Sequence, residues 1–503
     1  MGKMRTDFKH RTAWTCRPTG RIFGPPSSRQ APPPSKRLTR ARSNVFLVAP
    51  AYLLTMVPAR VAFPFLASLL AGFTPSAAQT LAQPVPRAAT DAPCPEGVAA
   101  GSRCLTGRDS LGAYYWLAMP PAWNRILVVH AHGGPELGQP KQGRASDDLT
   151  RWSIWTRAGY AYAGTGYHEA GVAVHSAASD LDRVRQLFVQ VFEAPKRTIL
   201  HGQSWGASVA AVAAETAPTA TAQRPYDGVL LTNGVLGGGS QSYDFRFDLR
   251  VVYQAVCGNH PHADEPGYPL WVGLPLLATL TRAQLATRVD ECTGVRLDAA
   301  KRTSQQQRNL NDILGVIRIP EHSLIAHLNW GTWHFQDIVF KRLGGRNPFT
   351  NAGVTYIGSH DDAALNARVF RTRADSGARA DFAADADPLG RIAVPVLTMH
   401  GINDPTAFVE LESVFRETTR RAGNSDRLVQ LFTNDEDHSY GSDAQYVTAM
   451  HELLQWVERG TRPTPSAVAA RCRVVAAVFT PDVGCRFLPA YTPRPLSERV
   501  PAR

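Results

Sequence analysis

A serine between two glycines is the feature with the clearest chemical meaning in this sequence. Residues 202–206 are Gly-Gln-Ser-Trp-Gly, a G-x-S-x-G pattern that follows a β-branched stretch and precedes a run of small residues. This context predicts a strand, a sharp turn and a helix, and the turn is so tight that its flanking positions must be glycine or similarly small. A serine on such a turn projects its hydroxyl above the sheet. Ser204 is therefore the candidate nucleophile.

A nucleophilic serine needs a base to remove its proton, and an acid orients that base. Residues 392–400 predict a buried strand, and Asp404 lies in the turn beyond it. Residues 427–432 predict the next strand, which is followed by an acidic loop that contains His438. Asp404 is therefore the candidate acid and His438 the candidate base.

Both assignments have alternatives. Asp404 precedes a predicted helix, residues 407–421, so it could serve only as the N-cap of that helix. His438 could be a solvated residue of an acidic loop. Asp435 and Asp437 are further candidate acids, but a triad acid normally lies on a different loop from the base.

Acyl transfer also needs two N–H donors for the developing oxyanion. One comes from the residue after the nucleophile and the other from the loop after an earlier strand. Residues 126–131 predict that earlier strand, and two glycines follow it closely. We expect the backbone N–H groups of Trp205 and Gly133 to serve, with Gly134 as a substitute for Gly133. A simple Gly-Gly turn is the alternative.

The order of nucleophile turn, strand, acid loop, helix, strand and histidine loop resembles an α/β-hydrolase, from about residue 113 to residue 457. His132-Gly133-Gly134 resembles the HG-type loop of esterases and lipases, although Pro135 replaces the last glycine of the longer HGGG form. The resemblance implies a serine hydrolase that cleaves a carboxylic ester through an acyl-enzyme, with no cofactor and no metal. The expected partner is a small-molecule or oligomeric ester, and the oligomeric state is left open.

Two other classes of function share this fold. An exported serine peptidase or aminopeptidase would need a carboxylate for the substrate's amino terminus, and the candidates are Glu136, Glu169, Asp361 and Asp362. A non-catalytic binding protein is less favoured, because no triad member is missing. The bridged cysteines beside the serine and histidine of fungal tannases and feruloyl esterases are replaced here by Gln203 and Ser439.

The predicted strands and helices alternate up to residue 235, which indicates an α/β fold with a mostly parallel, doubly wound sheet. We assign residues 79–235 and 391–459 to this α/β-hydrolase core. Residues 236–390 are expected to form a largely helical cap or lid, and residues 460–503 a C-terminal appendage. Substrate-lining aromatic residues are expected in the cap, although such residues more often form a core: Trp330, Trp333 and Phe335.

The amino-terminal segment, residues 1–78, predicts a leader and signal peptide. An apolar stretch, residues 61–73, precedes a small-residue cleavage site that ends at Ala78, and translation is suspected to start at Met56. A long leader or an amino-terminal membrane anchor is the alternative. The segment holds 12 Lys or Arg and one Asp or Glu, so it carries +11 of the formal net charge of +12. The remaining chain is nearly neutral, and it predicts neither nucleic-acid binding nor stable membrane insertion.

Cysteine usage also suggests export. Six of the 7 cysteines follow the leader, and an even number in an exported chain predicts disulfides. Proximity in sequence favours three pairs, although other connectivities are possible: Cys94 with Cys104, Cys257 with Cys292, and Cys472 with Cys485. The expected location is secreted or periplasmic.

Overall fold

The computed structural model of the chain describes residues 87–217, 224–478 and 484–503. The predicted leader, its cleavage site and the suspected start at Met56 lie outside these residues. Among the helices of the described ranges, none is long and apolar enough to cross a membrane.

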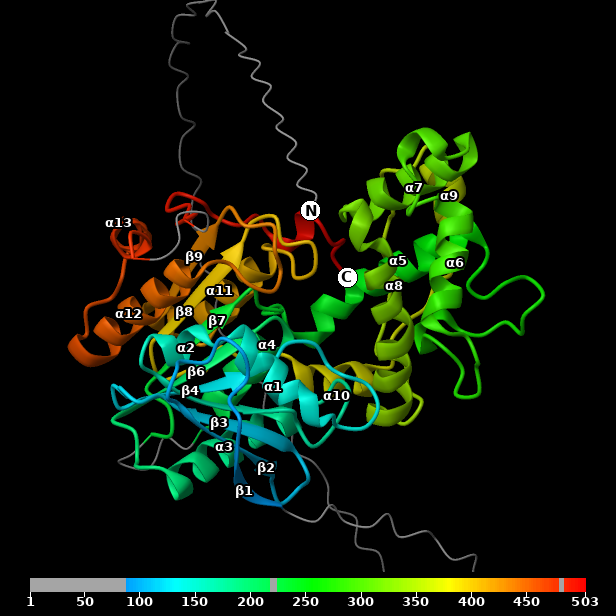
Figure 1. Ribbon diagram of the computed structural model, residues 1–503. Helices are drawn as coiled ribbons and strands as arrows, with labels where there is room; N and C mark the ends of the chain where they lie inside the picture. The colour runs from blue at the N-terminus through cyan, green and yellow to red at the C-terminus, as the bar shows by residue number, and fades with distance from the viewer. Residues whose placement is uncertain (1–86, 218–223, 479–483) are drawn as a thin grey trace, which may run out of the picture. The chain divides into compact units, whose positions relative to one another are not determined.

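The centre of the fold is a nine-stranded sheet with the order β1-β2-β3-β5-β4-β6-β7-β8-β9 (Figure 1). The first three strands and the β3–β5 pair are antiparallel, and all pairs from β5 to β9 are parallel. The predicted mostly parallel α/β sheet is thereby confirmed. The strands are β1 Arg87–Ala92, β2 Arg103–Arg108, β3 Tyr114–Met119, β4 Ile126–Ala131, β5 Ala161–Thr165, β6 Arg197–Gln203, β7 Gly228–Thr232, β8 Val396–Gly401 and β9 Leu428–Thr433.

Helices cover both faces of this sheet, which explains why its central strands are apolar at successive positions. In β4, Leu127 and Val129 belong to one apolar cluster and Val128 to another on the opposite face. The first cluster includes residues of α3 and α4, and the second includes residues of α2 and α12. The core helices are α1 Gln142–Arg151, α2 Ile154–Arg157, α3 Val174–Val191, α4 Trp205–Thr216, α11 Leu411–Arg421, α12 Asp443–Arg459 and α13 Pro465–Ala476.

Two predicted boundaries near the acid loop were wrong. The strand predicted at residues 392–400 begins only at Val396, because Pro395 has no N–H to donate and uses only its carbonyl, which accepts from Val229. The helix predicted at residues 407–421 begins at Leu411. The residues between Asp404 and this helix form turns, so the acid stands on a longer loop than expected.

The long segment between β7 and β8, called the insertion below, is largely helical, as predicted. Its first helix, α5, leads away from the sheet, and α6, α7 and α9 gather beyond it (Figure 1). The insertion also contains two stretches of π-helix, η4 and η5. Its main elements are α5 Gly238–Cys257, α6 Arg282–Thr293, α7 Ser304–Ile317, α8 Leu324–Asn329, η4 Trp330–His334, η5 Asp337–Arg342, α9 Asp362–Arg368 and α10 Ser376–Ala386.

The insertion is fastened to the core by carboxylates that accept backbone N–H groups at the start of α3. Asp337 of η5 accepts from the N–H of Val172 at 2.8 Å, and Asp385 of α10 accepts from Val174 at 3.1 Å. Acceptors at a helix start satisfy N–H groups that have no partner within the helix.

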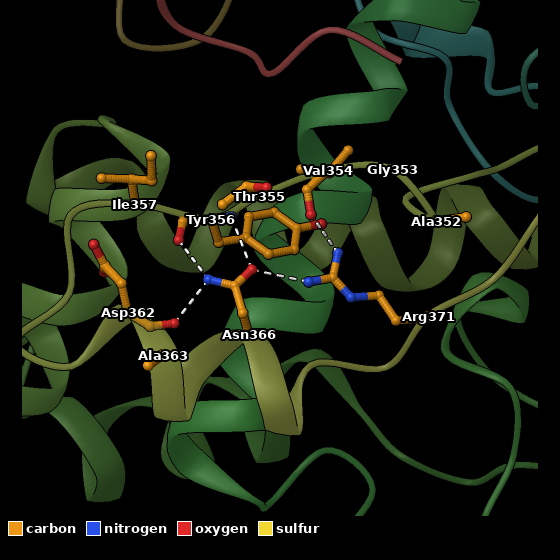
Figure 2. Close-up of a pocket in the computed structure, with 10 residues that line it drawn as sticks. All are labelled: Ala352, Gly353, Val354, Thr355, Tyr356, Ile357, Asp362, Ala363, Asn366 and Arg371. Carbon is orange, nitrogen blue, oxygen red and sulfur yellow. Dashed lines mark hydrogen bonds between the residues drawn. The ribbon is translucent and has the colours of Figure 1, made fainter.

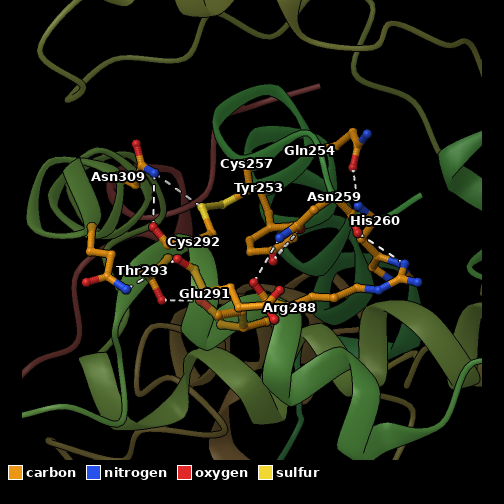
Figure 3. The surroundings of a disulfide bond; sticks show 12 residues. Tyr253, Gln254, Cys257, Asn259, His260, Arg288, Glu291, Cys292, Thr293 and Asn309 are labelled. Atoms are coloured by element: carbon orange, nitrogen blue, oxygen red, sulfur yellow. Dashed lines mark hydrogen bonds between the residues drawn. A yellow bond between two sulfur atoms is a disulfide. The ribbon is translucent and has the colours of Figure 1, made fainter. Parts of the chain in front are cut away.

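The three predicted disulfides are all present: Cys94–Cys104, Cys257–Cys292 and Cys472–Cys485. The second of these joins the end of α5 to α6 inside the insertion (Figure 3). Cross-links that close a loop restrict the unfolded chain more than the folded one, so this bond stabilises the pairing of the two helices.

Residues 460–503, expected to form an appendage, also contact the core and the insertion. Helix α13 packs beside α12, but the chain then runs along β9 and returns to the insertion. Arg499 pairs with Glu410 at 3.0 Å, and Arg503 pairs with Asp248 of α5 at 2.8 Å. The chain end therefore ties the insertion to the core, a contact between segments too distant in sequence for local patterns to reveal.

Candidate active site

Ser204 stands on a strained turn between β6 and α4. Its φ is 59° and its ψ is −126°, a conformation that non-glycine residues rarely adopt. The turn is held by its neighbours, because the Ser204 N–H donates to the carbonyl of Thr232 and the Ser204 carbonyl accepts from Val235. Such strain at a serine above the carboxyl edge of a parallel sheet is the arrangement that the G-x-S-x-G pattern predicts.

The two flanking glycines are required by close backbone contacts. A Cβ on Gly202 would lie 2.3 Å from the carbonyl oxygen of Gly206, and a Cβ on Gly206 would lie 2.1 Å from that of Ala131. No side chain can be accommodated at such distances. The close packing of strand β4, the Ser204 turn and α4 therefore requires glycine at both flanking positions.

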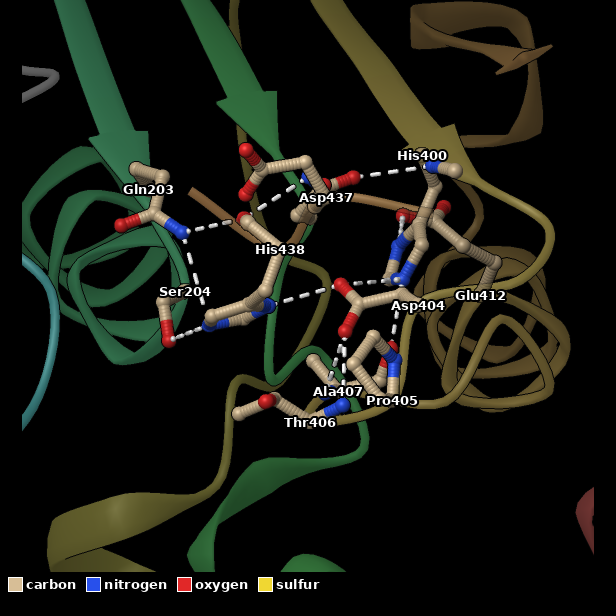
Figure 4. A network of polar contacts seen from close by, with 12 residues as sticks. Gln203, Ser204, His400, Asp404, Pro405, Thr406, Ala407, Glu412, Asp437 and His438 are labelled. Carbon is tan, nitrogen blue, oxygen red and sulfur yellow. Dashed lines mark hydrogen bonds and ion pairs between the residues drawn. The ribbon is translucent and has the colours of Figure 1, made fainter. Parts of the chain in front are cut away.

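The structure brings Ser204, His438 and Asp404 into one hydrogen-bonded chain (Figure 4). The Ser204 hydroxyl lies 2.8 Å from Nε2 of His438, and Nδ1 of His438 lies 2.7 Å from Oδ2 of Asp404. With Nδ1 protonated, His438 donates to the carboxylate and Nε2 accepts from the serine. This is the tautomer that a general base requires.

Asp404 serves both its own loop and His438. Asp404 uses Oδ1 to accept from the N–H groups of Thr406 and Ala407, at 2.8 and 3.0 Å, while Oδ2 faces His438. It thus holds its own loop and orients the histidine. Asp435 instead meets Gln445 and Arg486, and Asp437 accepts from the Ser439 N–H.

Two amides that the sequence analysis did not assign to the site hold the histidine loop. Gln203 donates from Nε2 to the carbonyl of His438 at 2.8 Å, and Asn233 donates to the same carbonyl at 2.9 Å. Asn233 also accepts from the N–H of Gly401 at 2.9 Å. Gln203 occupies the place of a bridged cysteine in the fungal pattern, so a hydrogen bond joins the nucleophile turn to the histidine loop here.

Gln203→Met is expected to lower the rate at which Ser204 reacts about 10-fold, because it removes a buried hydrogen bond that fixes His438 and keeps the side-chain volume. The rate of labelling by a fluorophosphonate measures this without knowledge of the substrate. Gln186→Met, an exposed change on α3, is the control and should react at the parental rate. An unchanged rate in Gln203→Met would show that Asn233 alone positions the loop.

A buried ion pair lies behind the acid. His400 and Glu412 have fully buried side chains, with Nδ1 of His400 3.1 Å from Oε1 of Glu412. Nε2 of His400 lies 2.8 Å from the carbonyl of Ala407 and 3.7 Å from Oδ2 of Asp404. Both ring nitrogens face acceptors, an arrangement that favours the imidazolium form. Burial lowers the pKa of His400, but the hydrogen bond and charge of Glu412, with the charge of Asp404, outweigh burial and raise it.

Glu412→Gln is expected to destabilise the fold by about 3 to 5 kcal/mol at pH 6, because it leaves the buried His400 with only the more distant Asp404 as a counter-ion. A histidine with a raised pKa stabilises the fold fully below its unfolded pKa, and this contribution disappears as the pH rises through the folded pKa. The loss should therefore be smaller at pH 9 than at pH 6. Urea unfolding at both pH values measures it.

The control for this prediction is Glu417→Gln on the same helix. Glu417 pairs with Arg420 in solvent, and its replacement should change the free energy of unfolding little at either pH. An equal loss at pH 6 and pH 9 in Glu412→Gln would contradict the imidazolium assignment.

The expected oxyanion donors lie near the nucleophile. Trp205 is the first residue of α4, where backbone N–H groups have no partner within the helix. A Cβ on Gly133 would lie 3.0 Å from Cβ of Ser204, so this backbone passes directly beside the nucleophile. The corresponding position on Gly134 has no atom within 4 Å among the described residues. Gly133 is thus the better placed of the two glycines.

The three aromatic residues expected to line the substrate pocket occupy different environments. Phe335 is 0% exposed and stacks on Phe349 with ring centroids 4.3 Å apart, so it belongs to the core of the insertion, the alternative that the sequence left open. The half-buried Trp333 has Arg282 over its ring. Trp330 contacts His327, whose Nε2 lies 2.9 Å from the carbonyl of Pro405 in the acid loop. Only Trp330 is therefore linked to the candidate active site.

A hollow of about 510 Å³ lies elsewhere in the insertion (Figure 2). Its polar groups already serve the surrounding backbone: Arg371 donates to the carbonyls of Asn351 and Val354, and Asn366 donates to those of Tyr356 and Asp362. Across the described ranges, no group of three or more His, Cys, Asp or Glu residues could hold a metal ion.

The strand order and the turn at Ser204 are those of the α/β-hydrolase fold. No protein-family model and no curated protein matches the sequence. Solved structures with weak similarity are α/β-hydrolases. Feruloyl esterase B from Aspergillus oryzae has a TM-score of 0.40 and 12% identity, over 76% of this chain and 89% of that one.

Two further structures illustrate the range of neighbours. The rice cell wall degrading esterase LipA from Xanthomonas oryzae, in a ligand-bound form, has a TM-score of 0.34 and 13% identity, over 71% of this chain and 89% of that one. An acylaminoacyl peptidase has a TM-score of 0.33 and 10% identity, over 70% of this chain and 40% of that one. These neighbours include both esterases and peptidases.

Proposed function

We propose that this protein is an exported serine hydrolase that cleaves a carboxylic ester through an acyl-enzyme. The observation that carries the proposal is the hydrogen-bonded chain from the Ser204 hydroxyl through His438 to Asp404 on a strained strand-to-helix turn. Three residues from three separate loops meet in the order that acyl transfer requires, with both ring nitrogens of His438 at hydrogen-bond distance from their partners.

In the proposed reaction, Ser204 Oγ attacks the ester carbonyl while its proton passes to Nε2 of His438. The Trp205 and Gly133 N–H groups stabilise the oxyanion that forms. His438 then gives its proton to the departing alkoxide, which leaves as an alcohol. A water molecule repeats the sequence on the acyl-enzyme and releases the carboxylic acid, while Asp404 stabilises the imidazolium throughout.

The environment of the acidic residues favours an ester over a peptide with a free amino terminus. Glu169 pairs with Arg342, and Glu136 lies 3.8 Å from Arg144. Asp361 caps α9, and Asp362 binds the turn that precedes it. The four carboxylates considered for an aminopeptidase therefore already have partners, which weakens the peptidase alternative.

Export is the second part of the proposal. The three disulfides support it, because such bonds form and persist in oxidising compartments. The proposed location is secreted or periplasmic. The helices of the insertion are proposed to act as a cap over the active site, since α5 begins just beyond the turn that holds Ser204 and His327 of α8 reaches the acid loop.

The test uses purified protein with p-nitrophenyl esters of increasing acyl length beside aminoacyl p-nitroanilides. A larger kcat/KM for the esters is expected. Preference for the anilides would support the peptidase alternative, and no turnover of either series together with no fluorophosphonate labelling would support a binding role.

A further inference from the structure

A buried arginine without a carboxylate partner lies in the insertion. Arg246 of α5 is 5% exposed. Within the described residues, its guanidinium makes one hydrogen bond, from Nη1 to the carbonyl of Ser242, and Nε has no acceptor. Arginine has five N–H donors, and a buried charge is costly unless it is paired. The described residues therefore provide neither a counter-ion nor enough hydrogen-bond acceptors for this guanidinium.

The nearest acids along α5 are already occupied. Asp244 accepts two hydrogen bonds from Arg379, both at 2.8 Å, and Asp248 pairs with Arg503. Each of these carboxylates thus balances another arginine. Burial lowers the pKa of Arg246 only to about 10, so its guanidinium remains charged at neutral pH.

Aromatic rings surround this charge. The guanidinium carbon lies 4.5 Å from the ring centroid of Phe245, 4.6 Å from that of Trp330 and 5.2 Å from that of Tyr243. Ring faces attract a cation and offset part of its desolvation, but they accept no hydrogen bonds along its edge. The rings therefore flank the guanidinium, and apart from the Nη1 bond to Ser242 its N–H donors have no acceptor among the described residues.

The cluster packs against the loop that carries the candidate acid. His327 contacts both Trp330 and Phe245, with ring centroids 5.3 and 5.1 Å apart, and lies 2.9 Å from the carbonyl of Pro405. The bond from Arg246 to Ser242 turns the guanidinium back toward the start of α5. Helix α5 begins at Gly238, shortly after β7 and after Val235, whose N–H donates to the Ser204 carbonyl.

Further polar atoms around Arg246 also have no partner among the described residues. They are Oγ of Ser242, on the same helix as Arg246, and Nδ1 of His327, whose ring contacts Phe245 and Trp330. Buried polar atoms in folded proteins are nearly always paired with protein, water or ligand. Their grouping beside an unpaired cation indicates a polar subsite rather than a packing defect.

We propose that Arg246, together with the Ser242 hydroxyl, binds a carboxylate on the substrate, so that this hydrolase acts on anionic esters. The inference rests on the proposed function and names its substrate class. The guanidinium fork matches the two oxygens of a carboxylate, and the hydroxyl can donate to one of them. One unpaired positive charge balances one carboxylate, whereas a phosphate dianion would keep an unbalanced negative charge.

The experiment compares pairs of esters that differ in one carboxylate. Monomethyl suberate beside methyl octanoate places the charge on the acyl side, and 4-acetoxybenzoate beside its methyl ester places it on the leaving side. The parent protein is expected to show at least about a 10-fold larger kcat/KM for the charged member of one pair. Comparable kcat/KM values within both pairs, or preference for the neutral members, would overturn the proposal.

Variants test whether Arg246 causes the preference for charged esters. Arg246→Gln should reduce the charged-to-neutral ratio of kcat/KM at least about 10-fold, and Arg246→Lys should give an intermediate ratio because it keeps the charge without the fork. Arg282→Gln removes an exposed cation from the same insertion and should leave the ratio unchanged. A ratio unaltered in Arg246→Gln would refute the assignment.

Two measurements separate this proposal from the proposed function. Fluorophosphonate labelling of Ser204 in each variant reports an intact active site, including in a variant that is destabilised. Calorimetry of Ser204→Ala with suberate and with benzoate reports carboxylate binding without any turnover. Binding in Ser204→Ala that weakens at least about 10-fold on adding Arg246→Gln supports the subsite even if no tested ester is cleaved. No measurable binding of either acid counts against it.

Discussion

Ser204→Ala and His438→Ala are each expected to reduce kcat about 10⁶-fold, and the double variant should be little worse than either one alone. The hydroxyl and the imidazole act as one unit, because the serine is nucleophilic only while Nε2 of His438 accepts its proton. Either change therefore removes the same step. Single-turnover hydrolysis of a p-nitrophenyl ester, with active-site concentration set by phosphonate titration of the parent, measures the three losses.

A serine on the same helix provides the control. Ser208 is buried on α4, and its hydroxyl donates to the carbonyl of Val235 at 2.7 Å without reaching His438. Ser208→Ala should keep its labelling by phosphonate and most of its kcat. Losses that add in the double Ser204→Ala, His438→Ala variant would mean that the two residues act in separate steps and that the proposed triad is wrong.

The sequence predicts those parts of the site that depend on residues close together in the chain or on the order of the strands. A β-branched run, two glycines and small helical residues are contiguous around Ser204, and they determine the strand, the turn and the helix together. Asp404 and His438 each follow an apolar strand, and the carboxyl ends of parallel strands meet at one edge of the sheet. The order of strands along the chain was therefore enough to bring these three residues together.

The supporting residues could not be predicted in this way. Gln203, Asn233 and Glu412 act through contacts with residues that are remote in sequence or that depend on side-chain orientation, and none belongs to a recognisable spacing. Glu412 lies in the helix after the strand that contains His400, and in sequence a glutamate at such a position predicts only a surface residue. Its role arises because α11 covers the sheet and directs this carboxylate to His400.

The roles of the aromatic residues could not be separated by sequence for a related reason. Trp330, Trp333 and Phe335 lie within six residues, yet they point to different neighbours because the chain is helical there. Their common spacing predicts neither a shared pocket nor a shared core. By contrast, Arg246 gives no signal in sequence, since a buried arginine is distinguished from an exposed one only by its surroundings.

Asp404→Asn is expected to lower kcat about 10⁴-fold, less than Ser204→Ala yet still severely. An amide at this position can donate to Nδ1 of His438, which places the ring proton on Nε2. The ring can then no longer accept the proton of Ser204. Ester hydrolysis across pH 6 to 9 measures this loss of kcat. Because Ser204 is still present in the variant, the loss reports the change of tautomer in His438.

Asp437→Asn is the matched control, because Asp437 lies beside His438 on the same loop and its side chain, within the described part of the chain, accepts only a local N–H from Ser439. It should remain near parental activity. Asp404 also lies 3.7 Å from the buried His400, so the free energy of unfolding of Asp404→Asn must be measured alongside its activity. A stable Asp404→Asn with full turnover, together with an inactive Asp437→Asn, would move the acid to the histidine loop. The 2.7 Å contact between Asp404 and His438 would then hold the loop without taking part in proton transfer.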